Sequence, residues 1–321
     1  MTERILITGG AGLIGSALCE RALESGARVT VLDNLSTGRP DNLPRDSAVK
    51  LVVGNVCDDA RVAALVRSCD RVAHLAAAVG VPLILERPTA SLRQSLLGTE
   101  IVLRHAAAAR RPVFFASTSE VYGEGGERAL REEDPVGFGA PDATRFSYAA
   151  GKAAGEALAF AYAHEYRLHV TAGRFFNVTG PRQSEACGAV VSRLVDQAAA
   201  GGPLTVHGDG QQTRCFLDAR DAAEYVWRLM HLEQDGGRLV NIGRDHPRSI
   251  LSVARRIRAL VDPALRIEHV PAGAAYGAGF VPIRHRRPDV TRLRELTGYE
   301  PRVSFDATLR AFLELRVRAA R

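Results

Sequence analysis

The sequence predicts an α/β fold of the doubly wound type, in which a parallel sheet carries helices on both faces and a smaller mixed C-terminal lobe follows. Three observations lead to this prediction. Short apolar runs alternate with helical stretches over the first half of the 321 residues, a glycine-rich turn follows the first run, and the alternation becomes less regular beyond Arg174. Alternating strands and helices are typical of a parallel sheet with crossover helices.

Apolar runs and helical spacing give the elements of the first half in order. Strands are predicted at residues 4–8, 28–32, 49–53, 72–76, 112–116 and 168–173. Helices are predicted from the glycine turn to Ser25 and at 58–67, 88–110 and 147–166. Apolar residues recur at helical spacing in the longer stretches, whereas the strands are short runs bounded by turn residues. His74, inside the fourth strand, is expected to be a packed core residue.

The turn after the first strand has the glycine spacing of a dinucleotide-binding site. Gly9, Gly12 and Gly15 allow the backbone to approach a pyrophosphate, whose charge is met by the N-terminus of the following helix. Asp33 ends the second strand about 20 residues later, where a carboxylate binds adenosine ribose hydroxyls and repels a 2′-phosphate. The sequence therefore predicts a Rossmann domain that binds NAD in preference to NADP.

The C-terminal part has shorter elements. Helices are predicted at 188–200, 218–232, 250–261, 289–297 and 305–318, short strands near 204–206 and 214–216, and a basic proline-containing loop at 282–289. Strand 238–242 is a candidate to return to the main sheet. We therefore assign 1–174 to the NAD-binding domain, with 218–245 returning to it, and 175–321 to a substrate lobe.

Composition argues against a membrane, secreted or nucleic-acid-binding protein. No run of about 18 apolar residues is present, and the first strand leaves no room for a signal peptide before it. The five cysteines lack metal-ligand spacing, which favours reduced thiols in the cytoplasm and no metal site. The net charge of +6 comes from dispersed arginines with one tight cluster at 284–287, so nucleic-acid binding is not expected.

Tyr148 and Lys152 form the strongest candidate for catalysis. They are four residues apart at the start of helix 147–166, so both lie on one helix face. An ammonium beside the phenol favours phenolate and makes the tyrosine a base near neutral pH. Lys50 is the other lysine among 42 basic residues and is expected at the surface. A lysine at position 152, where arginine is used nearly everywhere else, indicates a specific role.

A second candidate lies at the carboxyl end of strand 112–116. Ser117-Thr-Ser-Glu-Val-Tyr-Gly123 places hydroxyls and a carboxylate there, where ligands of parallel sheets bind. A hydrogen-bonded turn is the alternative explanation of the same residues.

Together these segments resemble the extended short-chain dehydrogenase/reductases that act on nucleotide sugars, from the first strand to the last helices. The resemblance is carried by Thr8-Gly-Gly-Ala-Gly-Leu-Ile-Gly15, Asp33-Asn-Leu-Ser-Thr-Gly38, His74-Leu-Ala-Ala77, Ser117–Gly123, Tyr148xxxLys152 and Arg174-Phe-Phe-Asn177. Within that group the UDP-glucuronate decarboxylases are most similar, on residues 116–122, 190–192, 203–214 and 285–289.

The resemblance implies roles for individual residues. Tyr148 would be the base, Lys152 would hold the nicotinamide ribose, and Thr118 would hydrogen-bond the sugar 4-hydroxyl. The implied catalytic set is Thr118, Ser119, Glu120, Tyr148, Lys152 and Arg286. The implied NAD contacts are Gly9, Gly12, Leu13, Ile14, Asp33, Asn34, Ser36, Thr37, Gly38, Asn55, Val56, Leu75, Ala76, Ala77, Tyr148 and Lys152. The implied substrate contacts are Arg145, Asn177, Val191, Thr205, His207, Arg214 and Arg286.

The chain departs from the family pattern at several positions. Ser95 replaces an asparagine of the long helix, Asn55-Val56 replaces an Asp-Val pair that reaches adenine, and His207 replaces an aromatic residue at the uracil edge. Residues 183–187 do not match well. These departures bear on the nucleotide and sugar fit more than on the NAD site.

The expected activity is NAD-dependent decarboxylation of UDP-glucuronate through a 4-keto sugar, to UDP-xylose or a UDP-4-keto-pentose. A nucleotide-sugar 4-epimerase is the alternative enzyme. An NAD-binding regulatory or RNA-binding protein with an idle site is the alternative from another class, although the intact set of Thr118, Tyr148 and Lys152 argues against it, because a binding module needs no base. The resemblance also implies a homodimer formed through helices 89–110 and 147–166.

Overall fold

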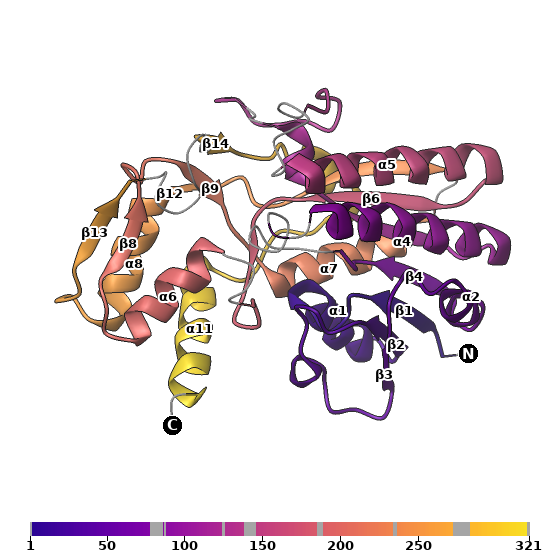
Figure 1. Ribbon diagram of the computed structural model, residues 1–321, viewed down its shortest axis with the longest axis horizontal. Helices are drawn as coiled ribbons and strands as arrows, with labels where there is room; N and C mark the ends of the chain where they lie inside the picture. The colour runs from indigo at the N-terminus through magenta and orange to yellow at the C-terminus, as the bar shows by residue number, and fades with distance from the viewer. Residues whose placement is uncertain are drawn as a thin grey trace.

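A computed structural model describes residues 2–77, 86, 88–123, 126–137, 146–184, 189–233, 236–271 and 283–319. Its centre is a seven-stranded sheet of order β11-β6-β5-β4-β1-β2-β3. A smaller group of helices and short strands lies at one end of this sheet (Figure 1). Arg145 lies outside the described residues.

All seven strands of the main sheet run parallel. They are β1 (Arg4–Thr8), β2 (Arg28–Asp33), β3 (Val49–Val53), β4 (Arg71–His74), β5 (Val113–Thr118), β6 (Val170–Phe175) and β11 (Gly237–Ile242). The strand order reverses between β1 and β4, which is where open α/β sheets bind ligands beyond the strand ends. The prediction of a doubly wound Rossmann sheet is confirmed.

Helices cover both faces of this sheet (Figure 1). Successive strand residues point to opposite faces, and Ile5 and Ile7 accordingly join one apolar cluster while Leu6 joins the other. The first cluster includes residues of α1 (Leu13–Glu24), α7 (Ala219–Met230) and α10 (Thr291–Thr297). The second includes residues of α2 (Asp59–Arg67), α4 (Pro88–Ala109) and α5 (Ser147–Tyr166).

The smaller part has an apolar core of its own. Around that core lie α6 (Val190–Ala199), α8 (Ile250–Val261), α11 (Phe305–Ala319) and the parallel pair of β8 (Leu204–His207) and β13 (Ile267–Val270). The other short strands are β7 (Val178–Thr179), β9 (Thr213–Cys215), β10 (Leu217–Asp218), β12 (Pro247–Ser249) and β14 (His285–Arg286). Single-turn helices lie at η1 (Pro40–Asn42) and η2 (Ser119–Tyr122).

Strand β11 pairs with β6 along its whole length, so the return of this segment to the main sheet is confirmed. The assignment of cofactor binding to 1–174 and of substrate binding to 175–321 remains a prediction.

Several predicted boundaries were wrong. β5 and β6 continue two residues further than expected, because Ser117 pairs with Arg174 and Thr118 with Phe175. Polar residues at these tips suggested loops, although the backbone ladder does not depend on side-chain polarity. β4 ends at His74 instead of Ala76, and the segment predicted as a loop at 282–289 contains β14.

Candidate active site

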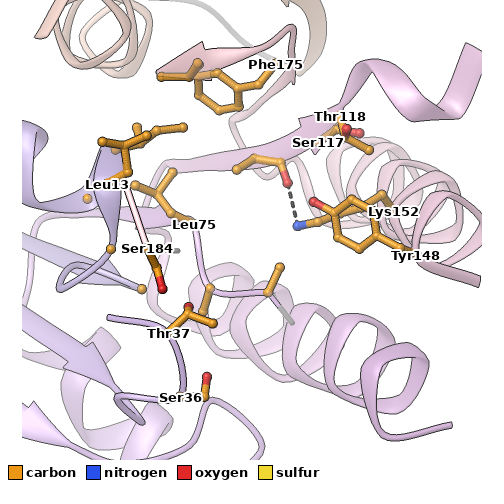
Figure 2. A pocket seen from close by; sticks show the side chains of 18 of the residues that line it. Leu13, Ser36, Thr37, Leu75, Ser117, Thr118, Tyr148, Lys152, Phe175 and Ser184 are labelled. Carbon is orange, nitrogen blue, oxygen red and sulfur yellow. Dashed lines mark hydrogen bonds between the residues drawn. The ribbon is translucent and has the colours of Figure 1, made fainter. Parts of the chain in front are cut away.

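A pocket of about 310 Å³ opens at the carboxyl ends of the main-sheet strands. Figure 2 shows side chains from the glycine turn, from β5 and from α5 around it. The predicted site residues that line it are Gly9, Gly12, Leu13, Ile14, Asp33, Asn34, Ser36, Thr37, Val56, Leu75, Ala76, Ala77, Thr118, Ser119, Glu120, Tyr148, Lys152, Asn177 and Arg286. The structure thus brings most of the predicted residues to one place.

The glycine turn leaves its backbone open to this pocket. Gly9 has a φ of 73°, and a Cβ there would lie 2.8 Å from the amide nitrogen of Ala76. Gly12 is the N-cap of α1 and provides no side-chain hydrogen bond to the first turn of the helix. Gly12, Leu13 and Ile14 line the pocket, so the partial positive charge of the helix N-terminus faces it.

Asp33 supports this turn and lines the pocket as well. Its Oδ2 accepts a 2.9 Å hydrogen bond from the amide of Ala11, and its Oδ1 accepts one of 2.8 Å from the amide of Leu35. A carboxylate has about four lone-pair sites, so these two bonds leave acceptor capacity for ribose hydroxyls.

His74 lies at the end of β4 beside the turn. One ring nitrogen is 2.7 Å from the hydroxyl of Thr8 and the other is 3.1 Å from the hydroxyl of Thr99. Complete burial lowers the pKa of His74 to about 3, with the nearby Lys152 charge acting in the same direction. His74 is therefore a neutral, hydrogen-bonded core residue, as expected.

Tyr148 and Lys152 are both buried on one face of α5, beside Ser117 and Thr118 of β5 (Figure 2). The Lys152 ammonium donates a 2.6 Å hydrogen bond to the carbonyl oxygen of Ala116. Burial lowers the pKa of Lys152 to about 8. The lysine is therefore mostly charged at neutral pH, and its charge favours ionisation of a phenol on the same helix face.

The tip of β5 continues into η2. Thr118 is the N-cap of η2, and its hydroxyl accepts a 3.3 Å hydrogen bond from the amide of Glu120. Thr118, Ser119 and Glu120 also line the pocket. The two explanations of this segment are compatible, because the hydrogen-bonded turn itself presents the polar side chains to the pocket.

Arg286 reaches the pocket from the smaller part of the molecule. It is buried, and its guanidinium donates a 2.8 Å hydrogen bond to the carbonyl oxygen of Gly123. Arg214 is its register partner on β9. Arg214 donates to the neighbouring carbonyl of Thr213 at 2.7 Å and does not line the described pocket.

Other predicted contacts lie away from the described pocket. Val191 is buried in the core of the smaller part and is not among the residues that line the pocket, so its assignment to substrate binding stays a prediction. Its place in the decarboxylase-like segment gave no information on which face of α6 it occupies. Thr205 accepts a 2.8 Å hydrogen bond from Gln197. His207 is half-buried, and burial and the Arg193 charge lower its pKa.

Two predicted NAD contacts are also displaced from this pocket. Gly38 is buried against Ala11, where a Cβ would lie 2.9 Å from the Ala11 carbonyl carbon. The Asn55 side chain accepts a 2.9 Å hydrogen bond from the amide of Cys57, in the turn before α2. Both residues therefore shape the loops around the pocket instead of lining it.

The pocket also contains residues that sequence reasoning missed. Gln94 contributes from α4, while Arg182, Gln183 and Ser184 contribute from the loop after β7. Arg182 follows a Gly-Pro turn at the end of a short strand, which was the one available signal. Nothing in the sequence distinguished Gln94 from the other polar residues of the long helix.

A family model described as the NAD dependent epimerase/dehydratase family matches residues 5–243. The chain belongs to this family. Several solved structures have the same fold as this epimerase/dehydratase family chain. A UDP-glucose 4-epimerase from Thermotoga maritima, solved with UDP-glucose, is 25% identical with a TM-score of 0.88, over 99% of this chain and 100% of the other. MoeE5, in complex with UDP-glucuronic acid and NAD, is 28% identical with a TM-score of 0.84, over 98% and 99%.

Curated relatives extend over nearly the whole chain. A UDP-N-acetyl-alpha-D-glucosaminuronate decarboxylase from Bacillus cytotoxicus is 37% identical over 98% of this chain and 98% of its own length. A UDP-glucuronic acid decarboxylase 1 from Danio rerio is 34% identical over 96% of this chain and 71% of its own length.

NAD is the cofactor of this epimerase/dehydratase family enzyme, and the described residues fit it. The glycine turn has no side chain where a pyrophosphate would meet the helix N-terminus, and Asp33 lines the same pocket. Across the described ranges, no group of three or more His, Cys, Asp or Glu is arranged to hold a metal ion. Among those same residues, no helix is long and apolar enough to cross a bilayer.

Proposed function

We propose that this enzyme decarboxylates UDP-glucuronate through a 4-keto intermediate and forms UDP-xylose or a UDP-4-keto-pentose. One observation carries the proposal. A tyrosine–lysine pair, a strand-tip threonine and a buried arginine line the same pocket: Tyr148, Lys152, Thr118 and Arg286. These residues supply a base, a hydrogen bond for a sugar oxygen and a counter-charge for phosphate or carboxylate. The curated decarboxylases matched over almost the whole chain support the same reaction.

Different residues of the pocket would bind different parts of the cofactor. The turn at Gly9–Gly15 and the N-terminus of α1 would hold the pyrophosphate, Asp33 the adenosine ribose, and Lys152 the nicotinamide ribose. When bound, NAD accepts a hydride from C4 of the sugar and can return it. The protein supplies orientation, proton transfer and charge.

Oxidation requires removal of the proton on the 4-hydroxyl. Tyr148 takes that proton as a phenolate, which the Lys152 ammonium favours. Thr118 hydrogen-bonds the same oxygen and directs it toward the base. The hydroxyl oxygen thereby becomes the oxygen of a C4 ketone.

The ketone makes loss of carbon dioxide possible. C4 is now β to the C6 carboxylate, so the C5–C6 bond can break with its electron pair moving into an enolate. Thr118 and the newly protonated Tyr148 stabilise the enolate oxygen by hydrogen bonds. Carbon dioxide leaves without a proton, and C5 is protonated afterwards. Glu120 would lie near the departing carboxylate, where it repels the carboxylate or orients the water that protonates C5.

Ser119 argues against dehydration, the other reaction that uses a 4-keto sugar. Removal of water from C5 and C6 needs an acid at the departing 6-hydroxyl, and the resembling dehydratases carry an aspartate between the residues that correspond to Thr118 and Glu120. Ser119 occupies that position here. A serine hydroxyl has a pKa far too high to act as that acid.

A 4-epimerase is the second candidate, because it uses the same oxidation and returns the hydride to the opposite face. The solved 4-epimerases that share this fold support it. The substrate could carry a hydroxyl or an acetamido group at C2 of the sugar, and this is a separate question from the reaction type. The relative from Bacillus cytotoxicus is named for an acetamido sugar acid.

Product mass decides among these reactions. Purified protein with NAD should convert UDP-glucuronate, or its 2-acetamido analogue, to a product lighter by one carbon dioxide. UDP-glucose and dTDP-glucose should give no dehydrated product. If UDP-glucuronate gives an isomer of unchanged mass, the proposed decarboxylase activity is wrong and the 4-epimerase activity takes its place. The preferred sugar acid is the one with the higher kcat/KM.

The proposal extends to a cytoplasmic homodimer that joins through α4 and α5. Leu97 on α4 is 42% exposed, and Tyr166 on α5 is 59% exposed. Small alanine side chains would let the helices of a second copy approach closely, and contact there would remove these two exposed apolar side chains from water. Cys19, Cys69 and Cys215 are buried free thiols, as expected in a reducing compartment. Light scattering of the wild type and of a Leu97→Glu variant tests the interface.

A further inference from the structure

A buried ion pair lies one helical turn beyond Lys152. The Glu156 carboxylate accepts two hydrogen bonds from the Arg174 guanidinium, of 2.9 Å and 2.7 Å. The side chain of Glu156 is 6% exposed and that of Arg174 is 3% exposed. The Ser117 hydroxyl donates a third bond, of 2.5 Å, to Glu156. The carboxylate is therefore held from two neighbouring strands behind the wall of the pocket.

Stability alone explains this ion pair poorly. Withdrawing charges from water costs several kcal/mol per ion, and apolar residues of similar volume often stabilise a fold equally well or better. The position of the pair is more informative. Ser117 belongs to β5, Glu156 to α5 and Arg174 to β6. The Ser117 bond therefore joins Glu156 to the strand that carries Thr118, and the ion pair joins the helix of Tyr148 and Lys152 to the next strand of the sheet.

Two successive residues of β5 are tied to two successive turns of α5. Lys152 donates to the carbonyl oxygen of the residue before Ser117, and Ser117 donates to Glu156, four residues after the lysine. These bonds fix the strand tip against the helix in one register. Thr118, the next residue of β5, is thereby held beside the helix face that carries Tyr148.

Glu156 also contributes negative charge beside the catalytic lysine. Burial lowers the pKa of Lys152, and the charge of Glu156 acts in the opposite direction. His74 is neutral and adds no charge of its own near neutral pH. Glu156 and His74 are the titratable groups that interact with the charge of Lys152. Around them, Arg174 is paired with Glu156, and Tyr148, Glu120 and Arg286 line the same pocket as Lys152.

We propose that Glu156, clamped by Arg174 and Ser117, is a positioning residue for this reaction. Its carboxylate fixes the tip of β5 against α5 and keeps a negative charge beside the ammonium of Lys152. The inference rests on the proposed function, because the role is defined by the Tyr148–Lys152 chemistry.

The two lysines of the chain make the charge role directly measurable. Protein labelled with ¹³C at lysine Cε should give two lysine resonances, which a Lys50→Arg variant assigns. Glu156→Gln should lower the pH at which Lys152 titrates by about one unit. Glu156→Asp keeps the charge but moves it away by one methylene. The pH at which Lys152 titrates in this variant should therefore lie between the values for the wild type and for Glu156→Gln. If Glu156→Gln does not fold, the titration of Lys152 in Glu156→Asp is compared with that in the wild type.

A matched control uses Glu224, a carboxylate that is also held in ion pairs, with Arg21 and Arg228, but does not line the pocket of Lys152. Glu224→Gln should leave the titration of Lys152 unchanged. The descending limb of kcat against pH should move to lower pH in the Glu156 variants by the same interval as the resonance. At the optimum pH, kcat should fall in the order wild type, aspartate, glutamine, and KM for the sugar should change little.

A Lys152 resonance that titrates at the wild-type pH in both Glu156 variants would overturn the charge role. An unchanged kcat in both would overturn the positioning role. The titration needs no sugar substrate. A wild-type protein that releases no carbon dioxide would therefore refute the proposed function, while the resonance still decides the position and charge of Glu156.

Discussion

The Lys152 ammonium lies 2.6 Å from the carbonyl oxygen of Ala116, two residues before Thr118. This bond joins the helix that carries the proposed base to the strand tip that carries the proposed contact with the sugar. Lys152 is 2% exposed, so its position is fixed by its surroundings. A small displacement of the charge should affect the phenol of Tyr148 more than it affects the fold.

Lys152→Arg tests that dependence. The planar guanidinium keeps the charge but cannot occupy the position of a compact ammonium. We expect kcat to fall by about 100-fold or more, the range usual for loss of acid–base function, with an unchanged circular dichroism spectrum. Lys50→Arg, at an exposed position, is the control and should keep full activity. Turnover within a few-fold of wild type in Lys152→Arg would mean that the lysine is structural.

Asp33 should set the cofactor preference. Its carboxylate is buried at the end of β2 and lines the pocket, where it would repel a 2′-phosphate. NAD should bind more tightly than NADP by more than about tenfold, or about 1.4 kcal/mol. Fluorescence titration with both cofactors measures this difference. Equal affinities for NAD and NADP would show that Asp33 does not determine the cofactor preference.

Local patterns identified residues of the proposed cofactor site that the structure brings to one pocket. The three glycines form one turn, Tyr148 and Lys152 lie one helical turn apart, and Asp33 is related to the glycine turn by the regular spacing of a strand–helix–strand unit. The Glu156–Arg174 pair was missed, because 18 residues separate the partners and a strand must return beside the helix to bring them together.

Residues of the smaller part were harder to predict. Val191 and Thr205 lie in segments that resemble the decarboxylases, but their side chains face the core and Gln197. Similarity of a segment does not specify which face of a helix or strand meets the ligand. Arg286 reaches the pocket because β14 pairs with β9, a contact between residues about 70 positions apart.

His74 should make the protein sensitive to acid. Burial lowers its pKa from 6.5 to about 3 in the folded state, so the unfolded chain takes up the proton first as pH falls below 6.5. The contribution of His74 to stability is complete above pH 6.5 and is lost as pH falls toward 3. Between pH 7 and 5 the loss should be about 2 kcal/mol.

Urea unfolding at pH 7 and pH 5 measures this loss. His74→Gln keeps hydrogen-bonding groups but cannot titrate, so its stability should fall less between the two values of pH. His164→Gln, at an exposed position on α5, should behave like the wild type. An equal fall in wild type and His74→Gln would show that another group controls the acid response.

Arg286 should determine affinity for the nucleotide sugar. It is buried, and its bond to Gly123 directs it toward the turn after the strand tip. Arg286→Gln should raise KM for the sugar by about tenfold or more, as expected for loss of a charge-assisted contact, and should leave NAD affinity unchanged. Arg284→Gln, at an exposed ion pair with Asp209, is the matched control. Normal KM in Arg286→Gln would place the phosphate contact elsewhere.

Release of labelled carbon dioxide tests the central claim most directly. UDP-glucuronate carrying ¹³C at C6 is incubated with the protein and NAD, and the headspace and the nucleotide sugars are analysed together. We predict one labelled carbon dioxide for each substrate consumed and an unlabelled UDP-pentose or UDP-4-keto-pentose. Label that stays at C6 of an isomeric UDP-hexuronate would contradict the decarboxylase and establish the 4-epimerase in its place.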